Sequence, residues 1–365
     1  MIRALSEDLK NKISAGEVVE RPASVVKELI ENSIDAGASQ VTVSIEKGGH
    51  NTIQVRDNGH GITPNELPVA VKRFHTSKIY TIDDLFSIST LGFRGEALAS
   101  IASISEMSII SSSKKGEGAE LSIVNGTLSK VQPAPKIGGT EISIRNLFYN
   151  TPARKKFLKT PRTELRKIVN VVRCYGLAFP DIEFKLIADN RNIFNVKSES
   201  LEERIDNLLD PTYSRNLIAI NTTKGDYAFT GFVGNLNLVR SRPGEQYLFL
   251  NRRFIKDRLI NRSIYNAYES LIKRGEYPFF VINLILPIDQ VDVNVHPMKN
   301  EVRFSDFNLL KSFIIKTFRD SFEKIGYENN KLKSSTPLVE ENNVNGFQEK
   351  IKLKETNYSN YEINN

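Results

Sequence analysis

The 365-residue sequence has a single cysteine, no tryptophan and no apolar run long enough to span a membrane. One cysteine excludes an internal disulfide framework, so Cys174, in the apolar stretch 168–175, is expected to pack in a helix. The N-terminus also lacks the pattern of a secretory signal peptide. These absences favour a cytosolic or nuclear protein, and the length favours two domains over one.

The formal net charge is only +7, but the positive charges are unevenly distributed. One stretch holds Arg154, Lys155, Lys156, Lys159, Arg162, Arg166, Lys167 and Arg173, with a single acid, Glu164. A second cluster consists of Arg240, Arg242, Arg252, Arg253, Lys256, Arg258 and Arg262. Such clusters are often solvated faces; the alternative is a surface that neutralises a polyanion.

The segment 21–37 is predicted to be a helix, because it opens near Pro22 or Ser24 and stops at Gly37. At roughly 100° per residue, Glu28, Asn32 and Asp35 share one narrow stripe opposite an apolar face. Two alternating runs, 41–45 and 53–57, follow and predict a β-hairpin. An acid, a carboxamide and a turn of the pattern D-x-G-x-G at Asp57 therefore come close together in the sequence.

Further along, the chain has features that suit a phosphate. Hydroxyls and a lysine occur at 75–78, glycines frame the entry to an apolar helix at 91–98, and Gly138-Gly139-Thr140 precedes an alternating strand. Glycines at a helix start let several N–H groups converge on an anion. Each feature alone is more often a solvated stripe or a plain turn, but together they predict an ATP-hydrolysing site.

The order of these motifs resembles the GHKL superfamily of ATPases, which includes gyrase, Hsp90, histidine kinases and MutL. Within it, ISAGEVVERP (13–22), NLFYNTPARKKFL (146–158) and VDVNVHPMKNEVRF (291–304) are similar to stretches of the MutL/PMS mismatch-repair family. The resemblance spans residues 1 to about 330. Two departures are Thr76 and Met298, where family members often have alanine; neither removes a group that the chemistry needs.

The resemblance implies a role for each matched residue. Glu28 resembles the general base for the attacking water, and Asn32 the Mg²⁺ ligand. Asp57 resembles the residue that accepts the amino group of adenine, with Lys299 reaching the γ-phosphate from the second domain. The remaining nucleotide-binding residues that it implies, those of the adenine pocket and of the phosphate lid, are Gly59, Gly61, Thr76, Ser77, Lys78, Gly92, Phe93, Arg94, Gly95 and Thr140.

The predicted fold class is α+β. Residues 1–205 are expected to form a GHKL (Bergerat-type) ATPase α/β sandwich, and residues 212–330 a transducer domain similar to the ribosomal protein S5 domain 2-like fold. Strands are expected at 227–233, 246–250 and 279–286, around a helix at 256–273. Residues 331–365, rich in Ser, Asn, Lys and Glu, are expected to be a disordered linker or tail.

The implied function is mismatch repair with ATP and Mg²⁺ as cofactors: slow hydrolysis, ATP-dependent homodimerisation, DNA clamping and signalling from a MutS-type protein to a nuclease or helicase. The protein would be cytoplasmic and nucleoid-associated in a bacterium, or nuclear in a eukaryote, and would hold DNA mostly through its backbone, independently of sequence. Four histidines and one cysteine offer no metal-site spacing, so we expect no endonuclease in this chain. Alternatives are a nucleotide-gated scaffold or another GHKL enzyme such as a topoisomerase subunit. The expected DNA contacts are Arg154, Lys155, Lys156, Lys159, Arg253, Lys256, Arg258 and Arg262.

Overall fold

The computed structural model describes residues 3–4, 13, 15–16, 18–81, 83–84, 90–113, 116–124, 126–268, 271–292, 303–304, 307–324 and 326. Lys299, most of the 291–304 motif and the expected tail at 331–365 lie outside these residues. Over the described ranges, no helix combines the length and apolarity that a bilayer crossing requires.

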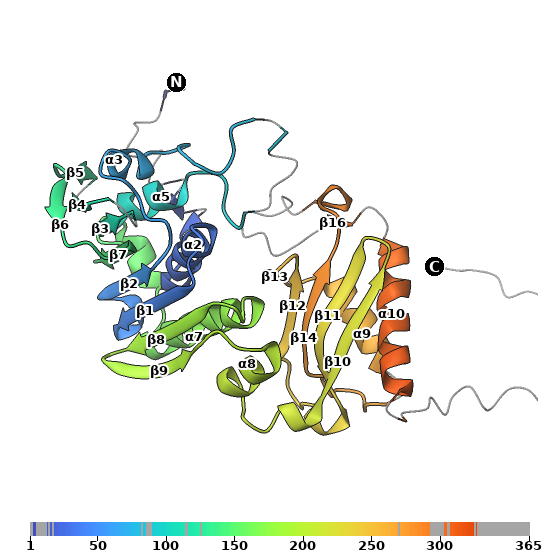
Figure 1. Ribbon diagram of the computed structural model, residues 1–365. Coiled ribbons are helices and arrows are strands. Elements are labelled where there is room, and N and C mark those ends of the chain that lie inside the picture. Colours follow the sequence, from blue (N-terminus) through green and yellow to red (C-terminus); the bar gives the residue numbers. More distant parts are fainter. Residues whose placement is uncertain are drawn as a thin grey trace, which may run out of the picture. The chain divides into compact units, whose positions relative to one another are not determined.

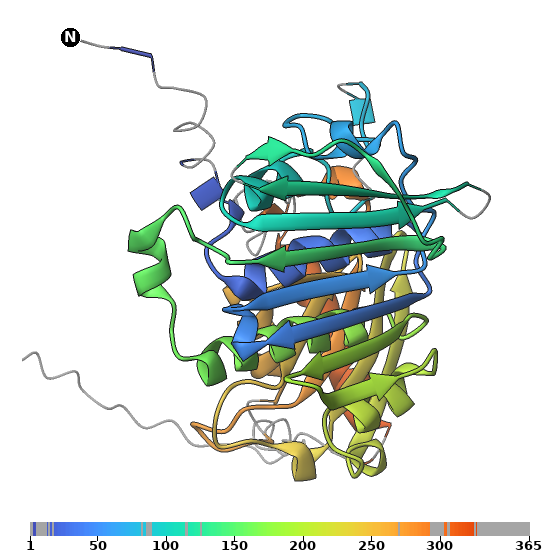
Figure 2. The same cartoon turned by 90° about the vertical axis from the view of Figure 1, so that its left-hand side faces the viewer.

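The first sheet has nine strands in the order β5-β4-β3-β7-β2-β1-β8-β9, with β6 beside β4 (Figures 1 and 2). β1 and β8 pair in parallel, and the other neighbours are antiparallel. The strands are β1 (Gln40–Glu46), β2 (Thr52–Asp57), β3 (Glu106–Ser112), β4 (Gly118–Val124), β5 (Thr127–Leu128), β6 (Gln132–Ala134), β7 (Gly139–Arg145), β8 (Glu183–Ala188) and β9 (Arg191–Val196).

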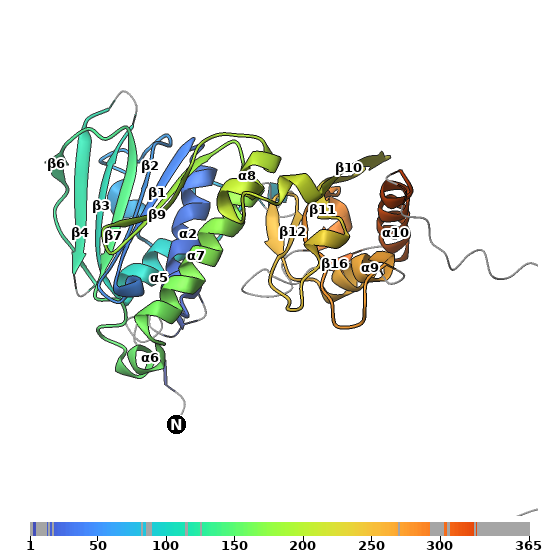
Figure 3. The same ribbon diagram turned by 90° about the horizontal axis from the view of Figure 1, so that it is seen from below.

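Buried and partly exposed residues alternate along the central strands, as expected for a sheet with one covered face. Val43 pairs with Val55 and Ile53 with Ile144, so buried side chains meet across three neighbouring strands. Helices α2 and α7 pack on this face (Figure 3). The helices and turns of this region are α2 (Pro22–Asp35), η1 (Lys47–Gly49), α3 (Leu67–Ala70), α5 (Ala97–Ser103), α6 (Pro152–Phe157), α7 (Pro161–Ala178) and α8 (Leu201–Leu208).

The second sheet has the order β10-β11-β14-β12-β13, with β12 parallel to β14 and the other pairs antiparallel. Helices α9 and α10 pack against each other, and their buried side chains share one core with the strands (Figure 1). The elements are η2 (Ser214–Asn216), β10 (Leu217–Lys224), β11 (Tyr227–Gly234), η3 (Leu236–Leu238), β12 (Gln246–Leu250), β13 (Arg253–Ile255), α9 (Arg258–Tyr268), β14 (Phe280–Ile285), η4 (Ile288–Gln290), β15 (Val291–Asp292), β16 (Arg303–Phe304) and α10 (Phe307–Glu323).

Strand β12 contributes to two hydrophobic cores. Leu248 and Leu250 point into the core with α9 and α10, whereas Tyr247 and Phe249 belong to the core that includes α2, α7 and the first sheet. Successive side chains of a strand point to opposite faces, so this division follows from the pleat. Both faces of β12 are therefore buried.

Most local predictions are confirmed. The first helix ends at Asp35, two residues before Gly37 with its φ of +69°, and the β1–β2 hairpin forms as expected. The strands predicted in the second region appear as β11, β12 and β14. The helix predicted over 256–273 is shorter, since α9 is described from Arg258 to Tyr268.

Candidate nucleotide site

The predicted nucleotide residues line one cavity of about 2050 Å³ beside α2. Pro22 occupies the first turn of α2, where its missing N–H costs nothing, and the apolar face of the helix is buried by Val25, Leu29 and Ile30. The cavity is lined by Glu28, Asn32, Asp57, Gly61, Thr76, Ser77, Lys78, Gly92, Phe93, Arg94, Gly95 and Thr140. Gly59 alone among the predicted nucleotide residues described does not line it.

Asp57 is held by donors from three segments. Its Oδ1 accepts the backbone N–H of Gly59 at 2.9 Å and of Thr140 at 3.3 Å, and its Oδ2 accepts the Ser33 hydroxyl at 2.8 Å. An ionised carboxylate has about four lone-pair sites, so Asp57 can accept another donor from a ligand. Gly59 thus acts on the site indirectly, by orienting Asp57.

The floor next to Asp57 is formed by backbone and hydroxyl groups. Gly61 has a φ of +76°, and a side chain there would meet the carbonyl oxygen of Ser112 at 2.2 Å. Thr140 is 7 % exposed, and its hydroxyl lies 2.9 Å from that of Ser111, which also accepts the N–H of Ile62. Because of its positive φ and the close carbonyl of Ser112, only a glycine fits the turn at residue 61.

Lys78 bridges the predicted lid to α2. Its Nζ lies 3.0 Å from Oδ1 of Asn32 and 2.5 Å from Oδ2 of Asp35. Asp35 also accepts the backbone N–H groups of Leu91 and Gly92, at 2.8 and 3.0 Å. The carboxamide oxygen of Asn32 therefore already faces the Lys78 amino group, while Asp35 holds the backbone at the start of the second lid segment, 92–95.

The second basic cluster divides between two places. Arg253 of β13 donates to the carbonyl oxygens of Thr90 and Leu91 at 3.2 and 3.1 Å. Lys256 and Arg258 also line the cavity, whereas Arg262 lies on the exposed side of α9. The guanidinium of Arg253 is thus hydrogen-bonded to the protein backbone beside the lid. The sequence had suggested only that Arg253 contacts DNA.

The first basic cluster is divided between α6, which has no buried residue, and α7, which carries Arg162, Arg166, Lys167 and Arg173. Lys155, Lys156 and Lys159 are exposed, but Arg154 is only partly exposed, and a side chain at Gly16 would meet its Nη2 at 1.7 Å. Arg154 therefore packs closely against the backbone near residue 16.

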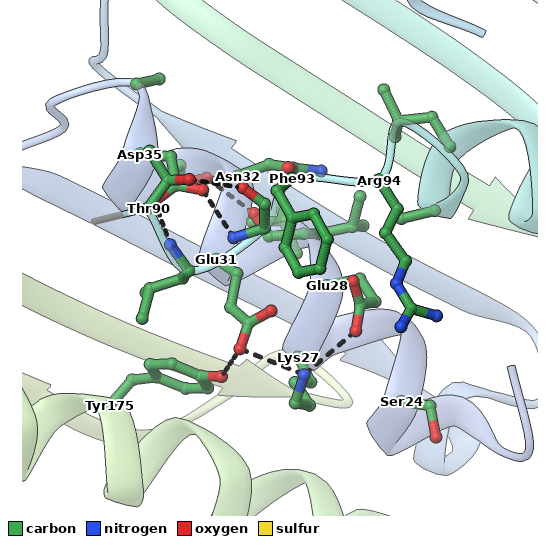
Figure 4. Close-up of a pocket in the computed structure, with 18 of the residues that line it drawn as sticks. Ser24, Lys27, Glu28, Glu31, Asn32, Asp35, Thr90, Phe93, Arg94 and Tyr175 are labelled. Atoms are coloured by element: carbon green, nitrogen blue, oxygen red, sulfur yellow. Dashed lines mark hydrogen bonds and ion pairs between the residues drawn. The ribbon is translucent and has the colours of Figure 1, made fainter. Parts of the chain in front are cut away.

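A buried contact below Glu28 was missed from the sequence (Figure 4). Glu31 is 3 % exposed, and the hydroxyl of Tyr175 on α7 donates to its Oε1 at 2.6 Å. Lys27 Nζ lies 3.1 Å from the same oxygen and 3.0 Å from Oε1 of Glu28. The i,i+4 spacing of Lys27 and Glu31 could have predicted their ion pair, but nothing in the sequence indicates that residues 31 and 175 are in contact.

Burial and charge fix the protonation of this group. Burial lowers the pKa of Lys27, but the carboxylates of Glu28 and Glu31 outweigh it and leave the pKa above its usual value. Burial raises the pKa of Tyr175 well above its usual value, and the charge of Glu31 raises it further. At neutral pH, Lys27 is therefore a cation and Tyr175 a hydrogen-bond donor.

The only cysteine lies beside this group and is predicted to be unreactive. Cys174 is partly exposed at the cavity wall, yet burial of its thiol raises its pKa to about 12, despite the positive charges of Lys256 and Arg173. A pKa about three units above the ordinary value leaves roughly 10³-fold less thiolate at pH 8. Reaction with a thiol-specific disulfide reagent at pH 8 is expected to be about 10- to 100-fold slower than after unfolding in guanidinium chloride, because the greater nucleophilicity of a high-pKa thiolate offsets part of the loss. Similar rates in the two states would contradict this environment.

Residues 20–141 match the family model of histidine kinase-, DNA gyrase B- and HSP90-like ATPases, and residues 205–323 that of the C-terminal domain of DNA mismatch repair proteins. The DNA mismatch repair protein MutL of Dictyoglomus thermophilum is 42 % identical over 321 residues, which are 88 % of this chain and 56 % of that protein. The chain belongs to the MutL family. MutL of Geotalea daltonii is 44 % identical over 306 residues, 84 % of the chain and 51 % of the relative. The chain thus spans about half the length of the curated MutL proteins that it matches.

Solved structures agree on the fold. The N-terminal domain of a DNA repair protein superposes with a TM-score of 0.72 at 23 % identity, over 86 % of this chain and 98 % of that domain. The MutL ATPase domain of Aquifex aeolicus complexed with ADP has a TM-score of 0.57 at 29 % identity, over 74 % of this chain and 93 % of that domain. The predicted fold class, a GHKL ATPase sandwich followed by a second α+β region, is confirmed.

Proposed function

We propose that this chain binds ATP in the cavity beside α2 and hydrolyses it slowly, as the ATPase of a mismatch-repair protein. The observation that carries the proposal is the convergence of Glu28, Asn32, Asp57 and the predicted lid residues on that one cavity. Membership of the MutL family and the ADP complex of the Aquifex relative support it. Residues 1–205 would be the ATPase domain and 212–330 the transducer.

Adenine is expected to bind at Asp57. The carboxylate is a pure acceptor, and the donors that hold it fix the direction of its lone pairs. The amino group of adenine can donate to it, whereas guanine presents a carbonyl oxygen at the equivalent position. The site is therefore expected to prefer adenine nucleotides, with the phosphates toward the lid residues 76–78 and 92–95.

The donor set fits a Mg²⁺ ion bound together with the nucleotide. The Oδ1 of Asn32 already accepts a bond from a cationic ammonium group, and a carboxamide oxygen is a suitable ligand for Mg²⁺. Among the described residues, no three His, Cys, Asp or Glu side chains are grouped to hold a metal. Asn32 would thus share the ion with phosphate and water, which is usual for Mg²⁺. When bound, the ion would neutralise charge on the phosphates.

In the proposed reaction, water attacks the γ-phosphorus and the bond to the β,γ-bridging oxygen breaks. The Glu28 carboxylate takes the proton of the attacking water, leaving ADP and phosphate. Lys299 would stabilise the charge of the γ-phosphate from the second region. It lies between β15 and β16, whose residues Val291 and Phe304 pair, but outside the described residues.

The wider function follows from the family as a further proposal. ATP binding would bring two copies of this region together, clamp DNA and signal from a MutS-type protein to a downstream nuclease or helicase. The better candidates for DNA-backbone contacts are the exposed Lys155, Lys156, Lys159, Lys256, Arg258 and Arg262, because Arg253 and Arg154 already pack against protein. The match at 205–323 favours mismatch repair over a topoisomerase subunit.

Nucleotide binding and hydrolysis together test the proposal. We expect ADP and ATP to bind more tightly than GDP and GTP, and ATP to be hydrolysed in Mg²⁺ but not in EDTA. Asp57→Asn is expected to weaken ADP binding by about 10- to 100-fold, because it replaces a charged acceptor. Asp226→Asn, at an exposed turn, is the matched control.

Calorimetry and a phosphate-release assay give three informative outcomes. Equal affinity for adenine and guanine nucleotides would contradict the role of Asp57. Binding without turnover would favour the nucleotide-gated scaffold. Absence of both would overturn the proposed function.

A further inference from the structure

The side chain of Lys27 takes an unusual course for a helical residue. Neighbours at positions i and i+1 of a helix do not face each other, yet Lys27 Nζ is 3.0 Å from the carboxylate of Glu28. One turn further on, Glu31 is in the favourable i+4 position and lies 3.1 Å from the same Nζ. The ion pair with Glu31 therefore explains why the side chain of Lys27 lies across α2, next to Glu28.

Glu31 needs this cation because it is buried. A buried carboxylate is costly unless it is paired and hydrogen-bonded, and its Oε1 has both a cation, Lys27, and a donor, Tyr175. The side chains of Lys27 and Glu28 are 26 % and 21 % exposed, so solvent screens this pair only partly. Two carboxylates share one ammonium group, and the hydroxyl of Tyr175 decides how strongly Glu31 competes for it.

We propose that Lys27, Glu31 and Tyr175 form a positioning unit that holds the Glu28 carboxylate oriented for its reaction with water. The proposal rests on the proposed ATPase function, but it assigns three residues that touch neither nucleotide nor water in that mechanism. In this unit, the hydrogen bond from Tyr175 stabilises the buried Glu31 carboxylate, so that the Lys27 ammonium group can also stay paired with Glu28 (Figure 4).

Other charged residues lie near Lys27, Glu31 and Tyr175, and the variants that test the proposal leave them unchanged. Figure 4 shows Phe93 and Arg94 on the same side of α2 as Glu28. From α7 and the second sheet, the charge of Arg253 acts on Tyr175, and the charge of Lys256 on Cys174. The charged and titratable residues that line the cavity include Glu20, Arg21, Lys27, Glu28, Glu31, Arg94, Glu96, Lys167, Cys174, Tyr175, Arg253, Lys256 and Arg258.

The test compares Lys27→Met and Tyr175→Phe with the unaltered chain. For Lys27→Met we expect kcat to fall about tenfold, and KM and the Kd for ADP to change less than about twofold. Tyr175→Phe is expected to give the same pattern at about a third of that loss, since Lys27 is then drawn toward Glu31.

Three control variants separate positioning from folding or bulk charge. Lys27→Arg keeps a cation and is expected to restore most of kcat. Lys72→Met removes an equally positive but exposed side chain, and Tyr265→Phe removes a hydroxyl from α9; both are expected to leave kcat unchanged. A loss in Lys27→Met that arises from poor folding would instead lower ADP binding in proportion.

The possible failures are distinguishable. If turnover depends on Glu28 but Lys27→Met keeps the kcat of the unaltered chain, the positioning unit is wrong and the ATPase assignment stands. If Lys27→Met and Lys72→Met lower kcat equally, the effect is bulk charge and the inference is overturned. If turnover survives in Glu28→Ala, Glu28 is not the base and the positioning unit fails, whereas the proposed function itself fails only if the chain neither binds nor hydrolyses ATP.

Discussion

Glu28→Ala is expected to lower kcat for ATP hydrolysis by about 10² to 10⁴, the range that a general base contributes. The carboxylate is only 21 % exposed and pairs with Lys27 at 3.0 Å, whereas the carboxylate expected to bind adenine is that of Asp57. The Kd for ADP is therefore expected to stay within about twofold. Phosphate release and calorimetry on the same preparations measure the two quantities.

Two further variants sharpen that experiment. Glu28→Gln keeps the shape of the side chain but cannot take a proton, so it is expected to lose as much turnover as Glu28→Ala. Glu117→Ala removes an exposed acid before β4 and is expected to keep full activity. Equal turnover in all four proteins would point to another base or to a contaminating ATPase, and would remove Glu28 from the mechanism.

Arg204→Met is expected to destabilise the fold by about 3 to 5 kcal/mol, since it breaks a buried charged network. The Arg204 side chain is fully buried, and its Nε donates to Glu199 at 2.6 Å. Its other nitrogens donate to the backbone carbonyl oxygens of Gly176, Phe179, Pro180, Ile182 and Lys197. These carbonyl groups lie at the end of α7, between α7 and β8, and between β9 and α8. The Arg204 side chain therefore crosslinks three segments of the chain through hydrogen bonds.

Urea unfolding followed by circular dichroism would measure the loss. Native domains are stable by only about 5 to 15 kcal/mol, so a large part of the total is expected to disappear. Arg191→Met, at an exposed position of β9, is the control and is expected to change stability by less than about 0.5 kcal/mol. A midpoint for Arg204→Met equal to that of the control would show that water replaces the guanidinium at little cost.

Local chemistry determined which elements could be predicted from the sequence. The ends of α2 and the β1–β2 hairpin are set by Pro22, Gly37 and a short turn, all within a few residues of the elements that they define. The order of the first sheet is not local: β2 pairs with β7, more than 80 residues later, and β1 pairs in parallel with β8. Alternation shows that a strand has a buried face but not which strand lies beside it.

The same limit applies to the candidate site. Glu28, Asn32 and Asp57 could be proposed because they lie in short motifs near one another in the sequence. Tyr175 and Ser111 could not, because an isolated hydroxyl in a long helix or strand carries no signal of a partner more than 25 residues away. The role proposed for Arg253 changed for a related reason: a basic cluster reveals its charge, but not that one of its members donates to Thr90 and Leu91.

The two buried faces of β12 bear on how the protein can be divided. A cut between residues 205 and 212 would sever only one peptide segment, but it would leave Tyr247 and Phe249 without the side chains of the first core. A separated second half would then present adjacent aromatic rings on an open sheet, a surface that favours aggregation. The two regions are thus separate along the sequence but share a hydrophobic core. Fragments divided between residues 205 and 212 are therefore expected to be poor substitutes for the intact protein.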